Sequence, residues 1–244
     1  MPSFYVNFTQ TDKVIDVYEE EFHHIHRVFR HKDGDLINIV NGFGLYATAE
    51  ITNINKKYLR LNIKNVEYKK KSARKIACAF SLLKNKNDLL VIEKLTELGV
   101  NEFFPMQTRY SVRQSKETTN EKFEKIAISA IKQCDNPYLP DINNVSNLDV
   151  TLSKIIAKGY IPIIASEREN ELFLSELLSE NQENDFCMVI GPEGGFSDEE
   201  FELFYELNIK QVSIGNHILR AETAAISAIS QLVFAYLKND KYWF

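Results

Sequence analysis

Ile190-Gly-Pro-Glu-Gly-Gly-Phe-Ser197 and Ile214-Gly-Asn-His-Ile-Leu-Arg-Ala-Glu-Thr-Ala224 are two segments near the end of the chain, and each follows a short apolar run. The first segment holds three of the nine glycines of the chain within five residues. Glycine adopts a positive φ without strain and lets the backbone approach a bound molecule closely, whereas proline fixes one φ and stiffens a turn. Both segments are therefore predicted to be ligand-binding loops that follow strands.

The end of the first segment carries a helix-start signal. Ser197 and Glu200 have the spacing of a capping box, which predicts a helix whose positive end faces the glycine loop. The glycine spacing matches neither G-x-G-x-x-G nor a Walker loop, because no Lys-Ser/Thr follows. Ser197 also has no histidine nearby in the sequence, so a nucleophile elbow is not indicated.

Apolar and helical patterns alternate from residue 76 onward. The strand candidates are 76–82, 100–104, 160–165, 186–190 and 211–214. The helix candidates are 88–98, a long helix from about 118 to the stop at Asn136-Pro137, 149–158, 171–179, 198–207 and 221–237. This alternation predicts an α/β fold with helices on both faces of the sheet.

The first part of the chain has a different pattern. Strand-like runs at 4–6, 36–40, 46–51 and 58–63, with one helical stretch at 20–30, predict a small β-barrel. A lysine-rich run at 69–75 is typical of an exposed linker. The predicted organisation is a domain of residues 1–70, a linker of 71–75 and a domain of 76–244.

Composition limits the class of protein. The 244 residues are 44% hydrophobic, which suffices for a substantial core. Neither a leader sequence nor an apolar run of bilayer length is seen, so we expect a cytoplasmic protein without a membrane partner. The three cysteines are widely separated, which favours small core residues over a disulfide framework or a zinc site.

Charge is distributed unevenly along the chain. Residues 1–75 carry 13 lysines and arginines against 9 acidic residues, while the remainder carries 16 against 25. Arg27 and Arg30, three apart on one side of the predicted helix, are suited to binding phosphates, although an ordinary solvated surface explains the same charges. Four histidines crowd this stretch, but a closed metal site lacks its fourth ligand, so no metal is predicted.

Several motifs occur in one order along the chain: His24-Ile-His-Arg-Val-Phe-Arg30, Gly34-Asp35, Lys94-Leu-Thr-Glu-Leu-Gly-Val100, Pro105, Lys132-Gln-Cys134 and the two segments quoted first. In this order they resemble the ribosomal RNA small subunit methyltransferase E family of the SPOUT superfamily, over nearly the whole chain. The resemblance implies a PUA-like RNA-binding β-barrel followed by a SPOUT methyltransferase domain with a deep trefoil knot. It also implies a homodimer, S-adenosylmethionine (SAM) as cofactor, and N3 of a uridine in 16S ribosomal RNA of the small subunit as the methylated atom.

The resemblance and the residue chemistry together give an expected site. The implied cofactor-binding residues are Ala165, Ser166, Gly191, Pro192, Glu193, Gly194, Gly195, Ile214, Gly215, Ile218, Leu219, Thr223 and Ala224. The implied RNA-binding residues are His24, Arg27, Arg30, Arg109 and Arg113. Arg220 is expected to stabilise negative charge on the uracil ring, Glu222 to orient Arg220, and Thr223 to cap the last helix. Glu193 is expected either to oppose the sulfonium or to cap backbone donors within its own loop.

The chain departs from the family pattern on the expected substrate side. Arg109-Tyr110-Ser111 stands where the family carries Glu-Arg-Ser, so Tyr110 occupies the usual arginine position. Lys132-Gln-Cys134 runs into Asn136-Pro137, and 84–88 replaces a basic-glycine turn. Two other functions remain open on the sequence: an RNA-binding protein without catalysis, and a metal-dependent hydrolase using Glu193 and Glu222.

Overall fold

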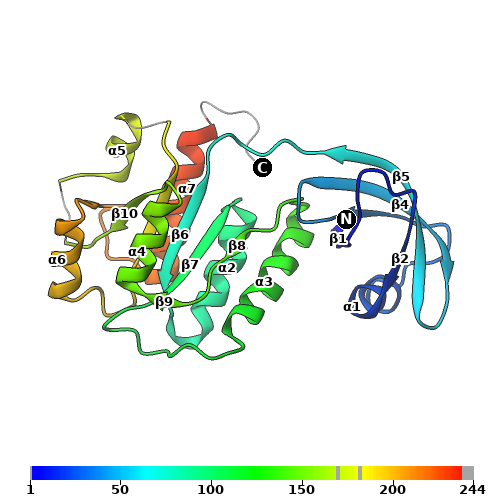
Figure 1. Ribbon diagram of the computed structural model, residues 1–244, viewed down its shortest axis with the longest axis horizontal. Helices are drawn as coiled ribbons and strands as arrows, with labels where there is room; N and C mark the ends of the chain where they lie inside the picture. The colour runs from blue at the N-terminus through cyan, green and yellow to red at the C-terminus, as the bar shows by residue number, and fades with distance from the viewer. Residues whose placement is uncertain (1, 169–170, 181–182, 238–244) are drawn as a thin grey trace. The chain divides into compact units, whose positions relative to one another are not determined.

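The computed structural model describes residues 2–168, 171–180 and 183–237, so residue 1 and residues 238–244 of the predicted domains lie outside it. The chain forms two compact units (Figure 1). The N-terminal unit contains residues 2–71 and 128–139, and the C-terminal unit contains residues 72–127 and 140–237. We retain the division into domains 1–70 and 76–244, with the linker 71–75, as a proposal.

The N-terminal unit is built on a five-stranded sheet with the order β1-β3-β4-β5-β2. Its strands are β1 (Phe4–Tyr5), β2 (Val14–Tyr18), β3 (Leu36–Val40), β4 (Leu45–Ile54) and β5 (Tyr58–Tyr68). The pair β1/β3 is parallel and the other pairs are antiparallel. The strand β2 was not predicted, because this edge strand buries only Val17 and therefore lacks a clear hydrophobic alternation.

Alternating side chains of β4 and β5 form the core of this unit. Ala47, Ala49 and Ile51 of β4 are buried together with Leu59 and Leu61 of β5. One helical segment adds Phe22 and Ile25 to the same core. This segment, predicted at 20–30, is observed as α1 (Glu19–His23) followed by the π-helix η1 (His24–Val28).

The C-terminal unit contains a parallel sheet with the order β12-β10-β11-β6-β7-β8, and β9 also pairs with β7. Its strands are β6 (Ile76–Ser81), β7 (Glu102–Gln107), β8 (Asp141–Ile142), β9 (Ser146–Asn147), β10 (Ile161–Ala165), β11 (Phe186–Ile190) and β12 (Lys210–Val212). The five predicted strands are confirmed with small shifts of their ends. The two-residue strands β8 and β9 were not predicted, because they are too short for periodicity.

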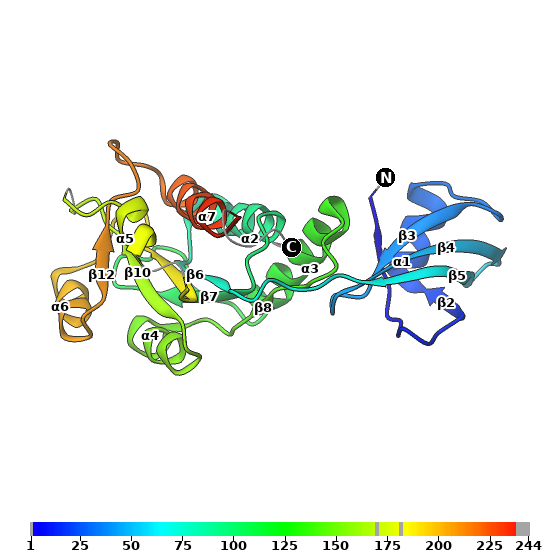
Figure 2. The same ribbon diagram turned by 90° about the horizontal axis from the view of Figure 1, so that it is seen from above.

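Helices cover both faces of this sheet, as the α/β prediction requires (Figure 2). The helices are α2 (Asn87–Glu97), α3 (Thr119–Cys134), α4 (Leu148–Ala157), α5 (Leu174–Glu180), α6 (Asp198–Glu206) and α7 (Ala221–Leu237), with a 3-10 turn η2 (Lys84–Lys86) before α2. One face packs against α4 and α6 through Ala77 and Ala79 of β6. Phe80, which alternation places on the other face, contacts Phe123 of α3, and α7 packs against β6, β11 and α2.

The cysteines follow the core prediction in two of three cases. Cys78 and Cys187 are fully buried, and burial raises the pKa of both thiols. Cys134 is exposed, so its prediction was wrong. It is the last residue of α3, and the buried stripe of that helix ends one turn earlier at Ile131.

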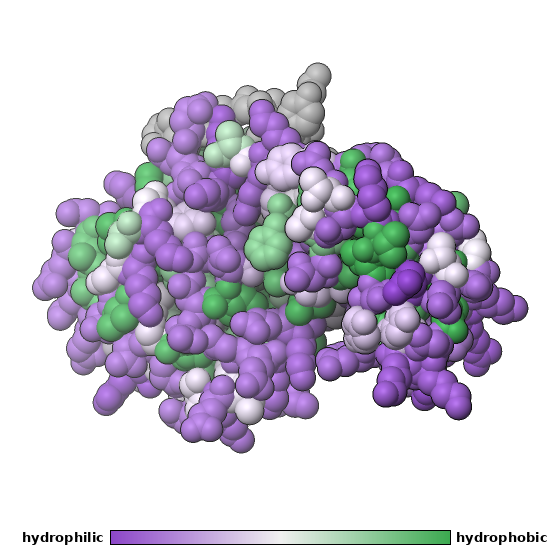
Figure 3. Space-filling view, turned by 45° about the vertical axis from the view of Figure 1, so that its right-hand side comes forward, coloured by the Kyte–Doolittle hydropathy of each residue, from purple (hydrophilic) through white to green (hydrophobic). Residues whose placement is uncertain are grey.

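The surface is mostly hydrophilic on the face drawn in Figure 3, where hydrophobic side chains form separate patches. Among the described residues, no helix is long and apolar enough to cross a bilayer.

Candidate functional site

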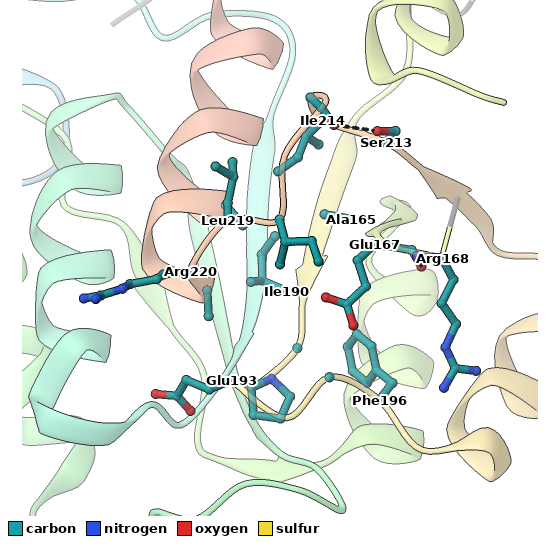
Figure 4. Close-up of a pocket in the computed structure, with 18 of the residues that line it drawn as sticks. Ala165, Glu167, Arg168, Ile190, Glu193, Phe196, Ser213, Ile214, Leu219 and Arg220 are labelled. Carbon is teal, nitrogen blue, oxygen red and sulfur yellow. Dashed lines mark hydrogen bonds between the residues drawn. The ribbon is translucent and has the colours of Figure 1, made fainter. Parts of the chain in front are cut away.

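A cavity of about 450 Å³ lies in the C-terminal unit where β10, β11 and β12 end (Figure 4). Three loops line it: residues 165–168 after β10, residues 190–196 after β11 and residues 213–221 after β12. Phe201 of α6 and Ala224 of α7 complete the lining. The carboxyl ends of parallel strands are the usual location of ligand sites in α/β folds. The structure thus brings together the two loops quoted first and the loop at Ala165 and Ser166 that the resemblance implied.

The glycine loop is shaped by close approach and by backbone conformation. A Cβ atom at Gly191 would lie 3.0 Å from the ring of Phe196, and one at Gly194 would lie 3.1 Å from Cβ of Tyr110. Gly195 has a φ of 71°, and its N–H donates to the carbonyl of Pro192 at 2.9 Å. Larger side chains at these positions would displace the loop or strain its backbone.

Two carboxylates attach this loop to more distant segments. Oε1 of Glu193 accepts a hydrogen bond from the N–H of Lys84 at 2.9 Å, in the turn that precedes α2. Glu193 therefore caps a backbone donor of a distant segment, whereas the expected donors lay within its own loop. Glu200 accepts from the N–H of Ser197 at 2.8 Å and from the N–H of Arg109 at 2.9 Å.

The capping box predicted at the start of α6 is confirmed. Oγ of Ser197 accepts from the N–H of Glu200 at 3.3 Å, while the Glu200 side chain accepts from Ser197. This reciprocal pair fixes the end of the glycine loop at the amino end of a helix.

The third loop is held by two hydrogen bonds at its start. Oγ of Ser213 donates to the carbonyl of Gly215 at 3.0 Å, drawn as the dashed line in Figure 4. Nε2 of Gln231, on α7, donates to the carbonyl of Ile214 at 3.0 Å. Ile214 and Leu219 are half-buried in the cavity wall, whereas Ile218 is 82% exposed.

The two arginines at the cavity differ in their partners. Arg168 donates to Asp198 at 2.9 Å, and its guanidinium lies 4.1 Å from the ring centroid of Phe201. Arg220 lies on the opposite side in Figure 4 and is exposed. Within residues 2–168, 171–180 and 183–237, no acidic side chain pairs with Arg220. Glu222 is 8% exposed, and no hydrogen bond between described atoms joins it to Arg220.

The remaining predicted cofactor residues are placed as follows. Ala165, Ser166 and Pro192 line the cavity, whereas Thr223 does not. The capping role expected for Thr223 is wrong, because α7 begins at Ala221 and Thr223 lies inside its first turn. Arg168, Phe196 and Phe201 also line the cavity but were not predicted. Phe196 lies inside the quoted loop and was not predicted because it is apolar.

The arginines expected near the substrate have different environments. Arg109 is exposed, while Arg113 forms an ion pair with the fully buried carboxylate of Asp88. Burial lowers the pKa of the Arg113 guanidinium. Tyr110 packs beside Gly194. The RNA-binding roles of Arg109 and Arg113 stay predictions.

The N-terminal unit holds the other predicted RNA-binding residues. Arg27 lies in η1 and Arg30 beyond its end with a φ of 59°, so the expected placement on one side of a continuous helix was wrong. Nζ of Lys132 lies 3.0 Å from Nδ1 of His24 and 2.9 Å from Oε2 of Glu21. In the described part of the chain, no group of histidine, cysteine or acidic residues is arranged to hold a metal.

Comparison with known proteins finds a family match for each of the two units. A family model for an RNA methyltransferase domain matches residues 70–233, and one for an RNA methyltransferase PUA domain matches residues 17–64. The chain is 30% identical to the ribosomal RNA small subunit methyltransferase E of Rickettsia conorii over 93% of each protein.

Solved structures extend the comparison. A Legionella pneumophila structure in complex with the cofactor SAM has a TM-score of 0.85 and 29% identity, covering 96% of this chain and 97% of the other. A SAM-bound ribosomal RNA small subunit methyltransferase E from Neisseria gonorrhoeae has a TM-score of 0.86 over 97% and 98% of the two chains. Its identity is 22%, so this second likeness concerns the fold.

Proposed function

This chain belongs to the ribosomal RNA small subunit methyltransferase E family, and we propose that it transfers a methyl group from SAM to N3 of a uridine in 16S ribosomal RNA. It is a SAM-dependent RNA methyltransferase with an N-terminal PUA domain. The observation that carries the proposal is the cavity at the ends of β10, β11 and β12, which three loops from separate parts of the chain enclose.

The cavity fits SAM in size and in chemistry. Its volume of about 450 Å³ lies within the range of small-molecule sites. Ile214 and Leu219 supply apolar walls suited to an adenine ring, and Gly215 leaves open space around its Cα. The bound cofactor would supply an electrophilic methyl group on a cationic sulfur. We assign Glu193 no direct contact with that sulfur, because its carboxylate accepts a hydrogen bond from the backbone N–H of Lys84.

The expected chemistry at the substrate assigns a role to Arg220. Uridine N3 loses its proton before or during attack on the methyl group, which leaves negative charge on the flanking carbonyl oxygens. Arg220 is exposed, pairs with no acidic side chain among the described residues and precedes the amino end of α7, a helix of 17 residues. Both the guanidinium and the helix end stabilise negative charge. Glu222, which is buried in the first turn of α7, would orient the start of that helix next to Arg220.

The assembly and the knot are further parts of the proposal. The loop at 213–220 leads from the edge strand β12 to α7, which packs against the central strands β6 and β11. We propose that this return of the chain passes through a loop, as the trefoil knot implied by the resemblance requires. We expect a cytoplasmic homodimer in which the apolar helix α7 contributes to the interface, and light scattering that gives a monomer mass at micromolar concentration would contradict the dimer.

The function is tested on small ribosomal subunits from a strain that lacks the modification. We expect methyl transfer from labelled SAM, followed by mapping of one modified uridine by mass spectrometry. The product should be N3-methyluridine, and Arg220→Ala should abolish it. Cofactor and RNA binding without any methyl transfer would instead support the RNA-binding protein without catalysis.

A further inference from the structure

Phe29 is an exposed aromatic residue in the N-terminal unit that the methyl-transfer site does not use. It directly follows η1 and is 46% exposed. Scattered exposed apolar side chains are common on protein surfaces and need no function. The surroundings of Phe29 distinguish it from such a residue.

The ring of Phe29 is held in place by three aromatic neighbours. Its centroid lies 5.4 Å from that of the buried Phe4 and 6.1 Å from that of His24, both in edge-to-face geometry. The ring of His31 is nearly parallel to it, with an interplanar angle of 17° and a centroid distance of 6.3 Å. These contacts restrict the rotation of a ring that is still half open to solvent.

One of these neighbours is itself fixed. Nδ1 of His31 lies 3.1 Å from Oδ2 of Asp35. The same oxygen accepts a hydrogen bond from the N–H of Lys32 at 2.8 Å. Asp35 therefore fixes the plane of the His31 ring, and with it the stack that supports Phe29.

Two arginines lie within two residues of Phe29 in the chain. Arg27 and Arg30 are both exposed, and neither forms an ion pair with any residue that the structure describes. Arg30 occupies a left-handed conformation, where glycine is the usual residue at a helix end. The N–H of His31 completes this turn by donating to the carbonyl of Ile25 at 3.1 Å. An arginine is thus kept beside Phe29 at a position that favours glycine.

We propose that Phe29 is a stacking platform for one unpaired RNA base, with Arg27 and Arg30 binding the phosphates beside that base. Single-stranded RNA is bound by aromatic side chains that stack on bases and by cations that contact the backbone. A fixed, half-exposed aromatic ring, with two exposed arginines close to it in the chain that form no ion pair among the described residues, meets both requirements. The inference rests on the proposed function in assuming an RNA substrate, and it assigns the contact to an unpaired nucleotide outside the methylated site.

The test measures the affinity of the full chain for fluorescein-labelled octauridylate. Phe29→Leu keeps a similar apolar volume but removes the flat face, so we expect binding about tenfold weaker. The slope of affinity against salt concentration should stay unchanged, because the arginines remain. Phe29→Trp should bind at least as tightly as the unaltered protein, and emission of the new tryptophan should be quenched by the RNA.

Phe43→Leu is the matched control. Phe43 is 76% exposed in the same unit, but its chain neighbours are Gly42 and Gly44 instead of arginines. We expect this variant to bind octauridylate normally. Affinity of Phe29→Leu within twofold of the unaltered protein, or an equal loss in Phe43→Leu, would overturn the proposal. Weaker binding to small subunits with normal binding to octauridylate would assign the surface to a ribosomal protein and also overturn it.

Methyl transfer by the unaltered protein separates this inference from the proposed function. If the unaltered protein methylates small subunits and Phe29→Leu binds RNA normally, the proposed function stands and the stacking role of Phe29 is overturned. If the unaltered protein neither binds octauridylate nor methylates subunits, the proposed function and the stacking role of Phe29 are both overturned.

Discussion

The cavity of the C-terminal unit and the arginine face of the N-terminal unit are built by different means. Backbone shapes the cavity: Gly191 and Gly194 fit against neighbouring side chains, and Gly195 adopts a positive φ. The arginine face consists of the exposed side chains of Arg27, Phe29 and Arg30 at the end of η1. A site built from backbone should be sensitive to added atoms, whereas a site built from side chains should be sensitive to the loss of charge or of an aromatic ring.

Arg220 differs from the backbone-built parts of the cavity, because its proposed role depends on its side chain. Its removal should have the largest effect on methyl transfer. Arg220→Ala should lower the single-turnover rate of methyl transfer by about 10²–10³-fold, with little change in affinity for SAM or for RNA. Rapid-quench measurements on small subunits would give this rate. Arg168→Ala is the control, because Arg168 lines the same cavity but is engaged by Asp198 and Phe201. Equal rate losses in both variants would contradict a specific role for Arg220.

Gly195→Ala should have the next largest effect. Alanine in the left-handed region costs about 1–2 kcal/mol, and the loop can relieve this strain by leaving its SAM-binding conformation. We expect affinity for SAM, measured by calorimetry, to fall about tenfold. Gly159→Ala is the matched control, because Gly159 also has a positive φ, of 85°, and lies in the turn between α4 and β10. The comparison fails if Gly159→Ala weakens SAM binding to the same degree.

The sequence predicts the backbone-built site better than the side-chain contacts around it. Glycine spacing and the capping box at Ser197 are local signals, and both identified real features of the cavity. The hydrogen bond from Lys84 to Glu193 joins residues 109 positions apart, and no local pattern encodes such a pairing. The ion pair of Asp88 with Arg113 was missed for the same reason.

The prediction of secondary structure from the sequence has a similar limit. The strand β3 was predicted with its observed ends, since its apolar run is bounded by turn residues. The π-helix η1 was expected to be ordinary helix, because five residues are too few to separate the two periodicities. Tyr110 was identified only as a departure from a family pattern, and its packing beside Gly194 needed the structure.

Removal of charge from the arginine face should have a moderate effect. Arg27→Gln combined with Arg30→Gln should weaken octauridylate binding several-fold at low salt and reduce the slope of log affinity against log salt by about 1.4. SAM affinity should not change. Lys56→Gln with Lys57→Gln removes the same charge from the exposed turn between β4 and β5. An equal reduction of the slope in this control would mean that RNA responds to net charge alone.

The smallest expected effect concerns an ion pair that supports the sheet of the N-terminal unit. Nε of Arg60 donates to Oδ1 of Asp16 at 2.7 Å and a terminal nitrogen donates to Oδ2 at 2.9 Å, which holds the pKa of Asp16 below its ordinary value. Because the folded pKa lies below the unfolded one, the stabilisation is present above about pH 3.9 and is lost as the pH falls through the folded pKa. Asp16→Asn should therefore lower the midpoint of thermal unfolding by about 1–3 °C at pH 7. Arg60→Gln should give the same pH dependence, and the coupling between the two substitutions should vanish once the pH lies below the folded pKa of Asp16. A coupling that persists at low pH would indicate that packing of the Arg60 side chain, and not its charge, holds β2 against β5.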